Sequence, residues 1–147
     1  AGSYAYWWDK EFSIEHDPSQ IHGETNHFRY RARSWHLIRF QSNDAGQISN
    51  AALIALACKT VDTPLLLSVA EKSEELSRFA KSTGAKLKVE SEEDLVSRLK
   101  LMKGGTLRIF GEYDRYKFSP AEIGNLPIIA PTAFANGRIE LHLQLLV

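Results

Sequence analysis

Short apolar segments alternate with helical patterns along residues 36–147, and this alternation limits the fold more than any other feature. A short, continuous apolar run is typical of a strand that is buried on both faces, as in a parallel sheet. Parallel strands need crossover connections, which are usually helical and right-handed. The predicted strands lie at 37–40, 65–69, 87–89, 107–110 and 128–130, and the predicted helices at 48–61, 73–83, 91–102 and from 119 onward.

This order of elements predicts an α/β fold. We expect a Rossmann-like three-layer sandwich with a mostly parallel sheet of about five strands and helices on both faces. Two of the predicted helices begin with strong capping signals, because Ser73 and Ser91 are each followed by acidic residues that favour a helix N-terminus. Gly84 is typical of a residue that ends a helix.

Residues 1–35 lack the alternation and predict an N-terminal helix followed by an extended arm. The spacing of Tyr4, Trp8 and Phe12 places three aromatic rings on one helical face. Residues 27–33 alternate apolar or aromatic residues with arginines, which indicates an extended segment. We expect residues 1–35 to pack on the α/β body, residues 36–147, or on a neighbouring domain.

The composition excludes several classes of function. Lys and Arg number 18, Asp and Glu also number 18, and this balance argues against a nucleic-acid partner. No apolar run approaches the roughly 20 residues that span a bilayer. The single cysteine, Cys58, and the lack of a signal-peptide pattern fit a reducing, cytoplasmic location. The apolar run at 145–147 favours a piece of a longer protein.

Residues suited to chemistry do not form a recognised motif. The loop 41–46 after the first strand has one glycine and lacks the G-x-G-x-x-G spacing of dinucleotide sites. Cys58 lies within an apolar helix, where a thiol stays protonated and inert. We therefore predict no catalytic, cofactor-binding or metal-binding residue, and assign His16, His22 and His27 to loop contacts, His36 to a strand end and His142 to the surface.

The arginines of the arm have two interpretations. Arg29, Arg31 and Arg33 could bind a phosphate or carboxylates of a partner. Alternatively, they pair with acidic residues of the same segment, and we favour this local pairing. The acidic candidates are Glu11, Glu15, Asp17 and Glu24.

The N-terminal residues resemble a known family. The strings Ser3-Tyr4-x-x-Trp7, Glu11-Phe12-Ser13, Glu15-His16-Asp17-Pro18-Ser19, Gly23-Glu24-x-Asn26 and Phe28-Arg29-Tyr30-Arg31 resemble a segment beyond the dehydrogenase core in proline utilization A and related delta-1-pyrroline-5-carboxylate (glutamate-semialdehyde) dehydrogenases. Asn136-Gly137-Arg138-Ile139-Glu140-Leu141 resembles the start of their last helix. The segment 138–147 fits either a helix or a strand by its pattern, and this resemblance favours the helix.

The resemblance implies a parent enzyme of proline catabolism that oxidises glutamate semialdehyde with NAD, and that also carries FAD if it is bifunctional. It carries no catalytic residue over to this chain. It implies instead a non-catalytic, C-terminal accessory domain that contacts the aldehyde dehydrogenase domain and supports it or a homo-oligomer. The expected contact residues are Tyr4, Trp7, Trp8, Phe12, His16, Arg29, Tyr30 and Arg31.

Two other functions are compatible with the α/β pattern. The first alternative is a free-standing domain that binds a nucleotide or another small ligand. The second is a receiver-like signalling domain, which needs an Asp at the end of a central strand. We disfavour it because the first predicted strand is followed by Gln41 and the third by Glu90.

Overall fold

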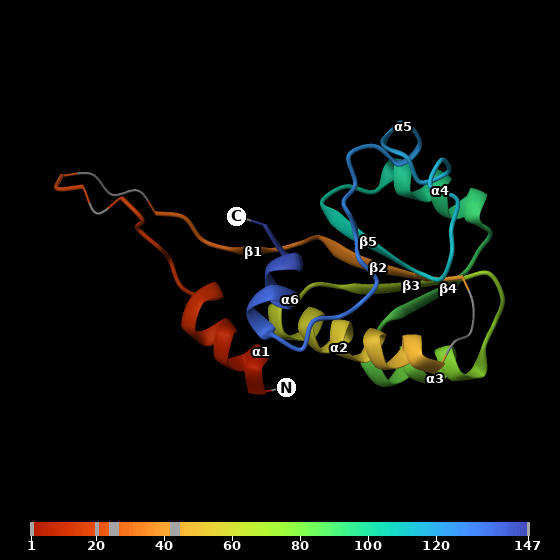
Figure 1. Ribbon diagram of the computed structural model, residues 1–147, viewed down its shortest axis with the longest axis horizontal. Helices are drawn as coiled ribbons and strands as arrows, with labels where there is room; N and C mark the ends of the chain where they lie inside the picture. Colours follow the sequence, from red (N-terminus) through yellow and green to blue (C-terminus); the bar gives the residue numbers. More distant parts are fainter. Residues whose placement is uncertain (1, 20, 24–26, 42–44, 147) are drawn as a thin grey trace.

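Five parallel strands form the central sheet of the computed structural model, which describes residues 2–19, 21–23, 27–41 and 45–146 (Figure 1). Their order is β4-β3-β2-β5-β6, so the chain starts in the middle of the sheet and extends it first in one direction and then in the other. The strands are β2 (Trp35–Phe40), β3 (Leu65–Val69), β4 (Lys86–Val89), β5 (Gly105–Phe110) and β6 (Ile128–Ile129). The predicted Rossmann-like parallel sheet is confirmed.

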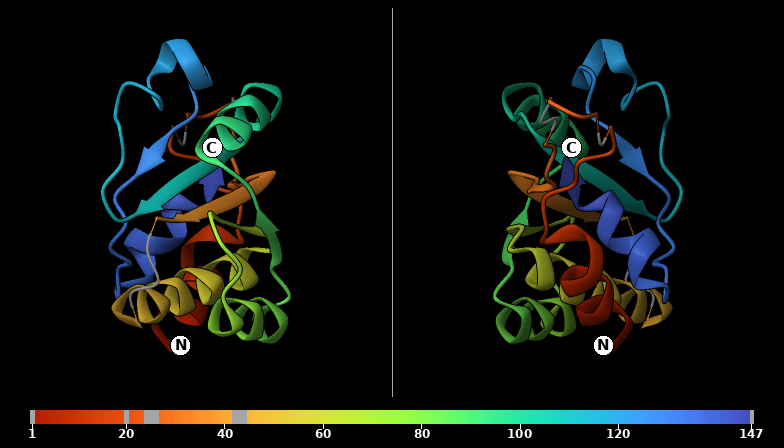
Figure 2. Two further views of the ribbon diagram at one scale, coloured as in Figure 1. Left: turned by 90° about the vertical axis from the view of Figure 1, so that its right-hand side faces the viewer. Right: turned by 90° about the vertical axis from the view of Figure 1, so that its left-hand side faces the viewer.

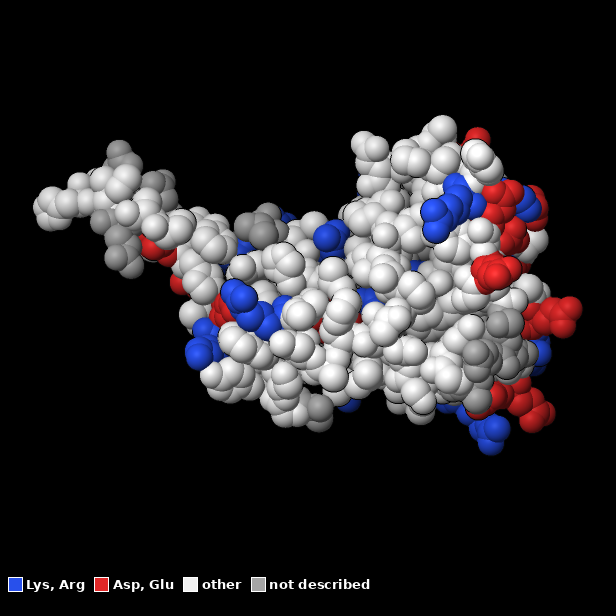
Figure 3. Space-filling model, viewed as in Figure 1, with Lys and Arg blue, Asp and Glu red and all other residues white. Residues whose placement is uncertain are grey.

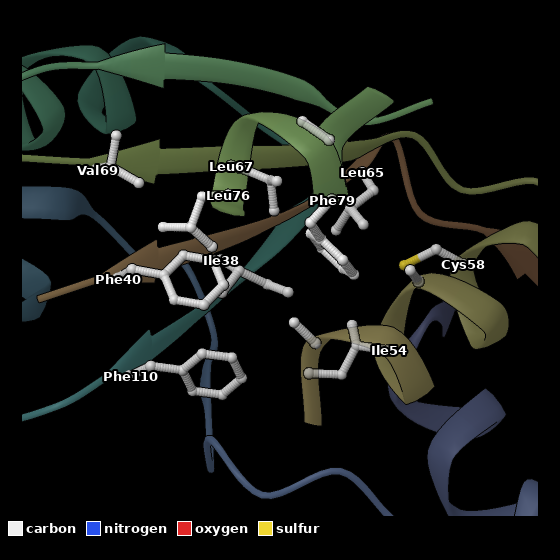
Figure 4. Close-up of a cluster of buried hydrophobic side chains, with 13 residues drawn as sticks. Ile38, Phe40, Ile54, Cys58, Leu65, Leu67, Val69, Leu76, Phe79 and Phe110 are labelled. Carbon is white, nitrogen blue, oxygen red and sulfur yellow. The ribbon is translucent and has the colours of Figure 1, made fainter. Parts of the chain in front are cut away.

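Helices cover both faces of this sheet (Figures 1 and 2). One face packs on α2 (Ala45–Val61) and α3 (Glu74–Thr83), and the other packs on α4 (Glu92–Leu101) and the short α5 (Pro120–Ile123). Side chains of β2 and β5 alternate between two buried clusters, because successive side chains of a strand point to opposite faces. Figure 4 shows the cluster between the sheet and the helices α2 and α3, where Phe40 and Phe110 meet edge to face.

Local signals define the helix ends. The Ser73 hydroxyl accepts a hydrogen bond from the Leu76 N–H, and the Ser91 hydroxyl accepts one from the Asp94 N–H, as the capping patterns predict. Gly84 ends α3 in the left-handed region, with φ of 75°. Helix α2 ends in the same conformation at Asp62, where φ is 59° and no glycine signals the turn.

The N-terminal segment forms a helix that changes its winding. Helix α1 (Gly2–Trp7) continues into the π-helix η1 (Trp8–Phe12). Tyr4 and Phe12 are buried, whereas Trp8 is only half-buried. The wider turn of the π-helix changes the angular spacing of the side chains, so the predicted aromatic face is only partly realised.

The C-terminal segment contains both a helix and a strand. Helix α6 (Gly137–Leu143) begins at Asn136, whose side chain accepts a hydrogen bond from the Arg138 N–H. Strand β7 (Leu145–Leu146) then pairs antiparallel with β1 (Arg31–Ala32), which precedes the central sheet in sequence. The expected helix is thus correct for the first part of 138–147, and the alternating pattern is correct for its end.

Helix α1 packs closely on α6, so the first residues belong to the same folded body. A Cβ atom on Gly137 would lie 2.5 Å from the Ser3 carbonyl oxygen and 2.9 Å from the Tyr4 Cα. The Gly137 N–H donates to the Ser3 hydroxyl at 3.0 Å, and the Tyr4 hydroxyl donates to the Phe134 carbonyl at 2.6 Å. Only a residue without a side chain permits this approach of two backbones.

We predict that Gly137→Ala destabilises the protein by about 1–3 kcal/mol, because the added methyl group meets backbone atoms that cannot rotate away. Urea unfolding measures the change, and tryptophan fluorescence should shift to the red as Trp7 and Trp8 become more exposed. Gly2→Ala is the matched control, because its Cβ would have no atom within 4 Å. Equal stability of the two variants would contradict the prediction.

Candidate functional site

The carboxyl edge of the sheet is the first place to look for a ligand, because open α/β sheets bind ligands outside these strand ends. The switch point lies between β2 and β5, where Gln41 and Gly111 follow the two strands. Residues 42–44 of the loop singled out in the sequence lie outside the described residues. Among the described residues, the side chains around Gln41 define this edge.

Several carboxylates lie at this edge, and they form ion pairs with the nearby Lys and Arg side chains. Glu92 accepts hydrogen bonds from Gln41 and from Lys117, the latter at 3.1 Å. Glu90 is buried and pairs with both Arg98 and Lys88. Burial alone would raise the pKa of Glu90, but the hydrogen bonds from Arg98, Ser68 and Lys88 hold it below its usual value. Lys88, Arg98 and Lys117 are thus paired with carboxylates and are not free for a phosphate, which disfavours a nucleotide site.

The Arg39 side chain at this edge is also engaged in hydrogen bonds within the protein. Its guanidinium is buried and donates to the Ser68 hydroxyl at 2.9 Å and to the Glu90 carbonyl at 2.8 Å. These bonds tie the ends of β2, β3 and β4 together. Arg39 therefore acts as a cross-link of the sheet, and its hydrogen-bonding groups are not directed to an open site.

A buried polar network lies on the face of the sheet that packs on α2, the face opposite to the Arg39 side chain. Arg108 of β5 pairs with Glu140 of α6 at 2.6 Å, and both side chains are 0% exposed. Gln144 donates to the same carboxylate oxygen at 3.2 Å. The other oxygen of Glu140 accepts from the Phe134 N–H at 2.9 Å. The network thus links the sheet to the C-terminal segment.

Burial keeps two potential nucleophiles protonated. Burial raises the pKa of Cys58 to about 12, and its thiol donates to Gln144 at 3.7 Å. Burial also raises the pKa of Tyr4 to about 12. Both groups are therefore protonated near neutral pH, and neither faces solvent. This confirms that Cys58 is a buried residue of α2.

His36 lies near the start of β2, at a strand end as expected, but it is fully buried. Its Nδ1 is hydrogen-bonded to the Thr106 hydroxyl at 2.6 Å. Burial, together with the positive charges of Arg108 and Arg33, lowers the pKa of His36 to about 3. His36 is thus neutral at physiological pH. His142, by contrast, is exposed as expected.

The expected contact residues gather around the arm, which we define as the described residues 13–19, 21–23 and 27–30. The arm leaves the body after η1 and returns to β1, and Figures 1 and 3 show that it projects well beyond the rest of the molecule. Two backbone hydrogen bonds between His16 and Phe28, at 2.9 and 3.0 Å, join its two sides. The arm is therefore a hairpin-like projection with a defined base.

Aromatic rings stabilise the base of the arm. His16 stacks on Phe28 with ring centroids 5.1 Å apart. Tyr30 meets Phe12 edge to face at 4.9 Å and His142 of α6 at 5.9 Å. Such ring pairs stabilise by more than their buried area alone. Tyr30 thus connects the arm to both η1 and α6.

The eight expected contact residues divide into two groups. Tyr4 and Phe12 are buried within the chain, where they pack on Val61, Leu141 and Leu145, and they offer almost no surface to a partner. Trp7, Trp8, His16 and Tyr30 are half-buried, and Arg29 and Arg31 are exposed. The accessible part of the expected contact surface is therefore formed by these six residues, which surround the base of the arm.

The predicted pairing of the arm arginines with local acidic residues is wrong for Glu11. Glu11 pairs instead with Arg138 at 2.6 Å. This pair lowers the pKa of Glu11, mainly through the hydrogen bond from Arg138. Arg33 donates to the Leu143 carbonyl at 3.1 Å and thereby caps α6. Within the described part of the chain, Arg29 and Arg31 form no ion pair. Glu24 lies outside the described residues.

Two hollows flank the base of the arm. One, of about 470 Å³, lies between η1 and α6 and includes Glu11, Arg138 and His142 in its lining. The other, of about 450 Å³, we call the arm groove. Its lining consists of Trp8, Phe12, Ser13, Glu15, Arg29, Tyr30, Arg31 and Ala32.

Sequence reasoning missed the buried network and the role of Arg138. Arg108 stands between Leu107 and Ile109 in a strand that is otherwise apolar, and this is the signal that could have identified a buried charge. Glu140 carries a similar signal between Ile139 and Leu141. Pairing the two residues needs the fold, because they lie 32 positions apart.

The chain was compared with family models, curated proteins and solved structures, and none of them matches. These comparisons therefore give the resemblance noted in the sequence no support. Among the described residues, no cluster of three or more His, Cys, Asp and Glu side chains is arranged to hold a metal ion. No helix in the described ranges is long and apolar enough to cross a membrane.

We predict that Glu140→Met destabilises the protein by about 3–5 kcal/mol, because it leaves the Arg108 charge buried and unpaired. The double variant R108M/E140M should recover most of this loss, because it removes both charges. Urea unfolding measures both values. The exposed pair Lys100–Glu122 supplies the control, since Glu122→Met should cost less than about 1 kcal/mol. A double variant no more stable than Glu140→Met would contradict the prediction.

The lowered pKa of His36 should make the free energy of unfolding depend on pH. Its pKa is about 3 in the folded protein and about 6.5 when unfolded, so between these values the unfolded state binds the extra proton. This proton uptake lowers stability as pH falls through that window, by up to about 1.4 kcal/mol per pH unit. His36→Asn should flatten this slope in urea unfolding across the window, whereas His142→Asn, at an exposed position, serves as control. Parallel slopes for wild type and His36→Asn would disprove the assignment.

Proposed function

We propose that this chain is an accessory domain that docks through its arm on another domain of its parent protein and performs no catalysis itself. The observation that carries the proposal is the arm, which projects from a well-packed body while its base is held by aromatic contacts. Ile14 is 45% exposed and Ile21 is 53% exposed on this projection. A partner that packs on this projection would bury both side chains and gain apolar contact area.

The reactive groups of the chain support the same class of function. Cys58, Tyr4 and His36 are buried within the body, and the carboxyl edge of the sheet presents carboxylates such as Glu92 where a phosphate would bind. The alternative, a free-standing domain that binds a nucleotide or small ligand, draws its support from the Rossmann-like strand order alone. Fold does not specify function, so we rank this alternative second.

We further propose the particular partner: the aldehyde dehydrogenase domain of a glutamate-semialdehyde (delta-1-pyrroline-5-carboxylate) dehydrogenase of proline catabolism. The support is the resemblance of two segments, residues 3–31 and 136–141, to that family. The two resembling segments are in contact here, through the ion pair Glu11–Arg138 and the close approach of Ser3 to Gly137. NAD, and FAD in a bifunctional parent, would then belong to the partner domains and not to this chain.

We expect the chain to form a complex with the glutamate-semialdehyde dehydrogenase of the same genome at micromolar concentration, as measured by size-exclusion chromatography with light scattering. The double variant I14S/I21S should weaken this complex at least tenfold, because it removes the exposed apolar contacts of the arm. Leu101→Ser is the control, since Leu101 is 85% exposed but lies at the end of α4, away from the arm.

Two results would contradict the proposal. One is the absence of any complex with the dehydrogenase at micromolar concentration. The other is oxidation of glutamate semialdehyde with NAD by this chain alone, which would assign the catalysis to residues of this chain.

A further inference from the structure

The backbone of the arm has an open edge beside the arm groove. In an antiparallel pair, the N–H and C=O groups of successive residues point alternately to the two sides of a strand. Arg33 donates its N–H to Gln144, on the side of β7, whereas Phe28 exchanges both of its bonds with His16 on the other side. The N–H and C=O of Tyr30 and Ala32 therefore point away from β7, toward the arm groove.

These backbone groups are available for a partner. No hydrogen bond among the described residues uses the backbone N–H or C=O of Tyr30 or Ala32. Ala32 is exposed and Tyr30 is half-buried, so both can be reached from solvent. An unpaired strand edge is a template for a further strand, and adding an extended peptide to such an edge is a common mode of recognition.

The side chains along the edge select the kind of strand. Arg29 and Arg31 lie two residues apart, so they project to the same face of the extended segment. Neither pairs with a carboxylate in the described ranges, and a neighbouring strand would place its own side chains directly beside them. Trp8, which is half-buried, also lines the groove. Glu15 also lines the groove and would repel a carboxylate of the partner. Acidic residues of the partner are therefore expected beside Arg29 and Arg31 and away from Glu15.

We propose that the arm groove binds an extended acidic segment of a partner protein, which adds as a strand to the free edge of β1. Carboxylates spaced two residues apart on this segment pair with Arg29 and Arg31, and an apolar residue between them contacts Trp8. The arginines also repel basic strands, so they make the edge selective. This inference names the chemistry of the segment through which the proposed docking function acts, and it rests on that function.

The test uses a blocked heptapeptide in which Glu and Val alternate, with an alternating Lys and Val peptide as comparison. Fluorescence polarisation should show that only the acidic peptide binds, and that added salt weakens the binding. Hydrogen exchange followed by NMR should show that the amides of Tyr30 and Ala32 become protected in the complex. That protection distinguishes strand addition from non-specific attraction between charges.

Two variants separate charge from backbone pairing. R29E/R31E should weaken binding of the acidic peptide about tenfold or more, whereas R78E/R115E, which reverses two exposed arginines elsewhere, should leave it within about twofold. Ala32→Pro removes a backbone N–H of the free edge and should also weaken binding. R29E/R31E changes only exposed side chains, so it tests the inference even if Ala32→Pro does not fold.

The inference is overturned if the acidic peptide does not bind, if both peptides bind equally, or if binding leaves the Tyr30 and Ala32 amides unprotected. It is also overturned if R29E/R31E binds the dehydrogenase as well as wild type does, although the proposed function would then stand. If the acidic peptide binds at this edge but the dehydrogenase does not, the proposed partner is wrong and the strand-binding site remains.

Discussion

The ion pair between Arg108 and Glu140 is the interaction on which the arrangement of the chain ends depends. Both side chains are fully buried, and removing two charges from water is costly unless they pair and make further hydrogen bonds. Glu140 meets this condition by accepting from Arg108, Gln144 and the Phe134 N–H. One carboxylate thus fixes α6 against the sheet, and the position of α6 determines where the remaining terminal elements lie.

The arm is positioned through α6. Helix α1 packs against α6 at Gly137, and β1 pairs with β7, the strand that follows α6. Tyr30 contacts both η1 and α6 at the point where the arm returns to the body. The direction of the arm is therefore set by packing within the folded chain. A projection with a fixed base loses less conformational entropy on binding than a flexible tail does.

The sequence predicted the central sheet well, because its signals are local. Each of the five strands overlaps a predicted strand, and four of them contain a short, mainly apolar run. Ser73, Ser91 and Gly84 mark helix ends through their own side chains or backbone freedom. The site was less predictable, because its interactions join distant parts of the chain. Glu11 pairs with Arg138 rather than with an arginine of its own segment, and the two residues are 127 positions apart.

The placement of charge explains why a Rossmann-like scaffold can serve in docking rather than in nucleotide binding. Its carboxyl edge lies at the end of the molecule opposite the arm (Figure 1). There Glu92 and Glu93 share the single ammonium of Lys117, which leaves no free cation in this trio for a phosphate. At the arm end, Arg29 and Arg31 are exposed next to a free strand edge. The charge suited to binding an anionic group has thus been placed on the arm, where backbone pairing can add the geometric selectivity that surface charges alone do not provide.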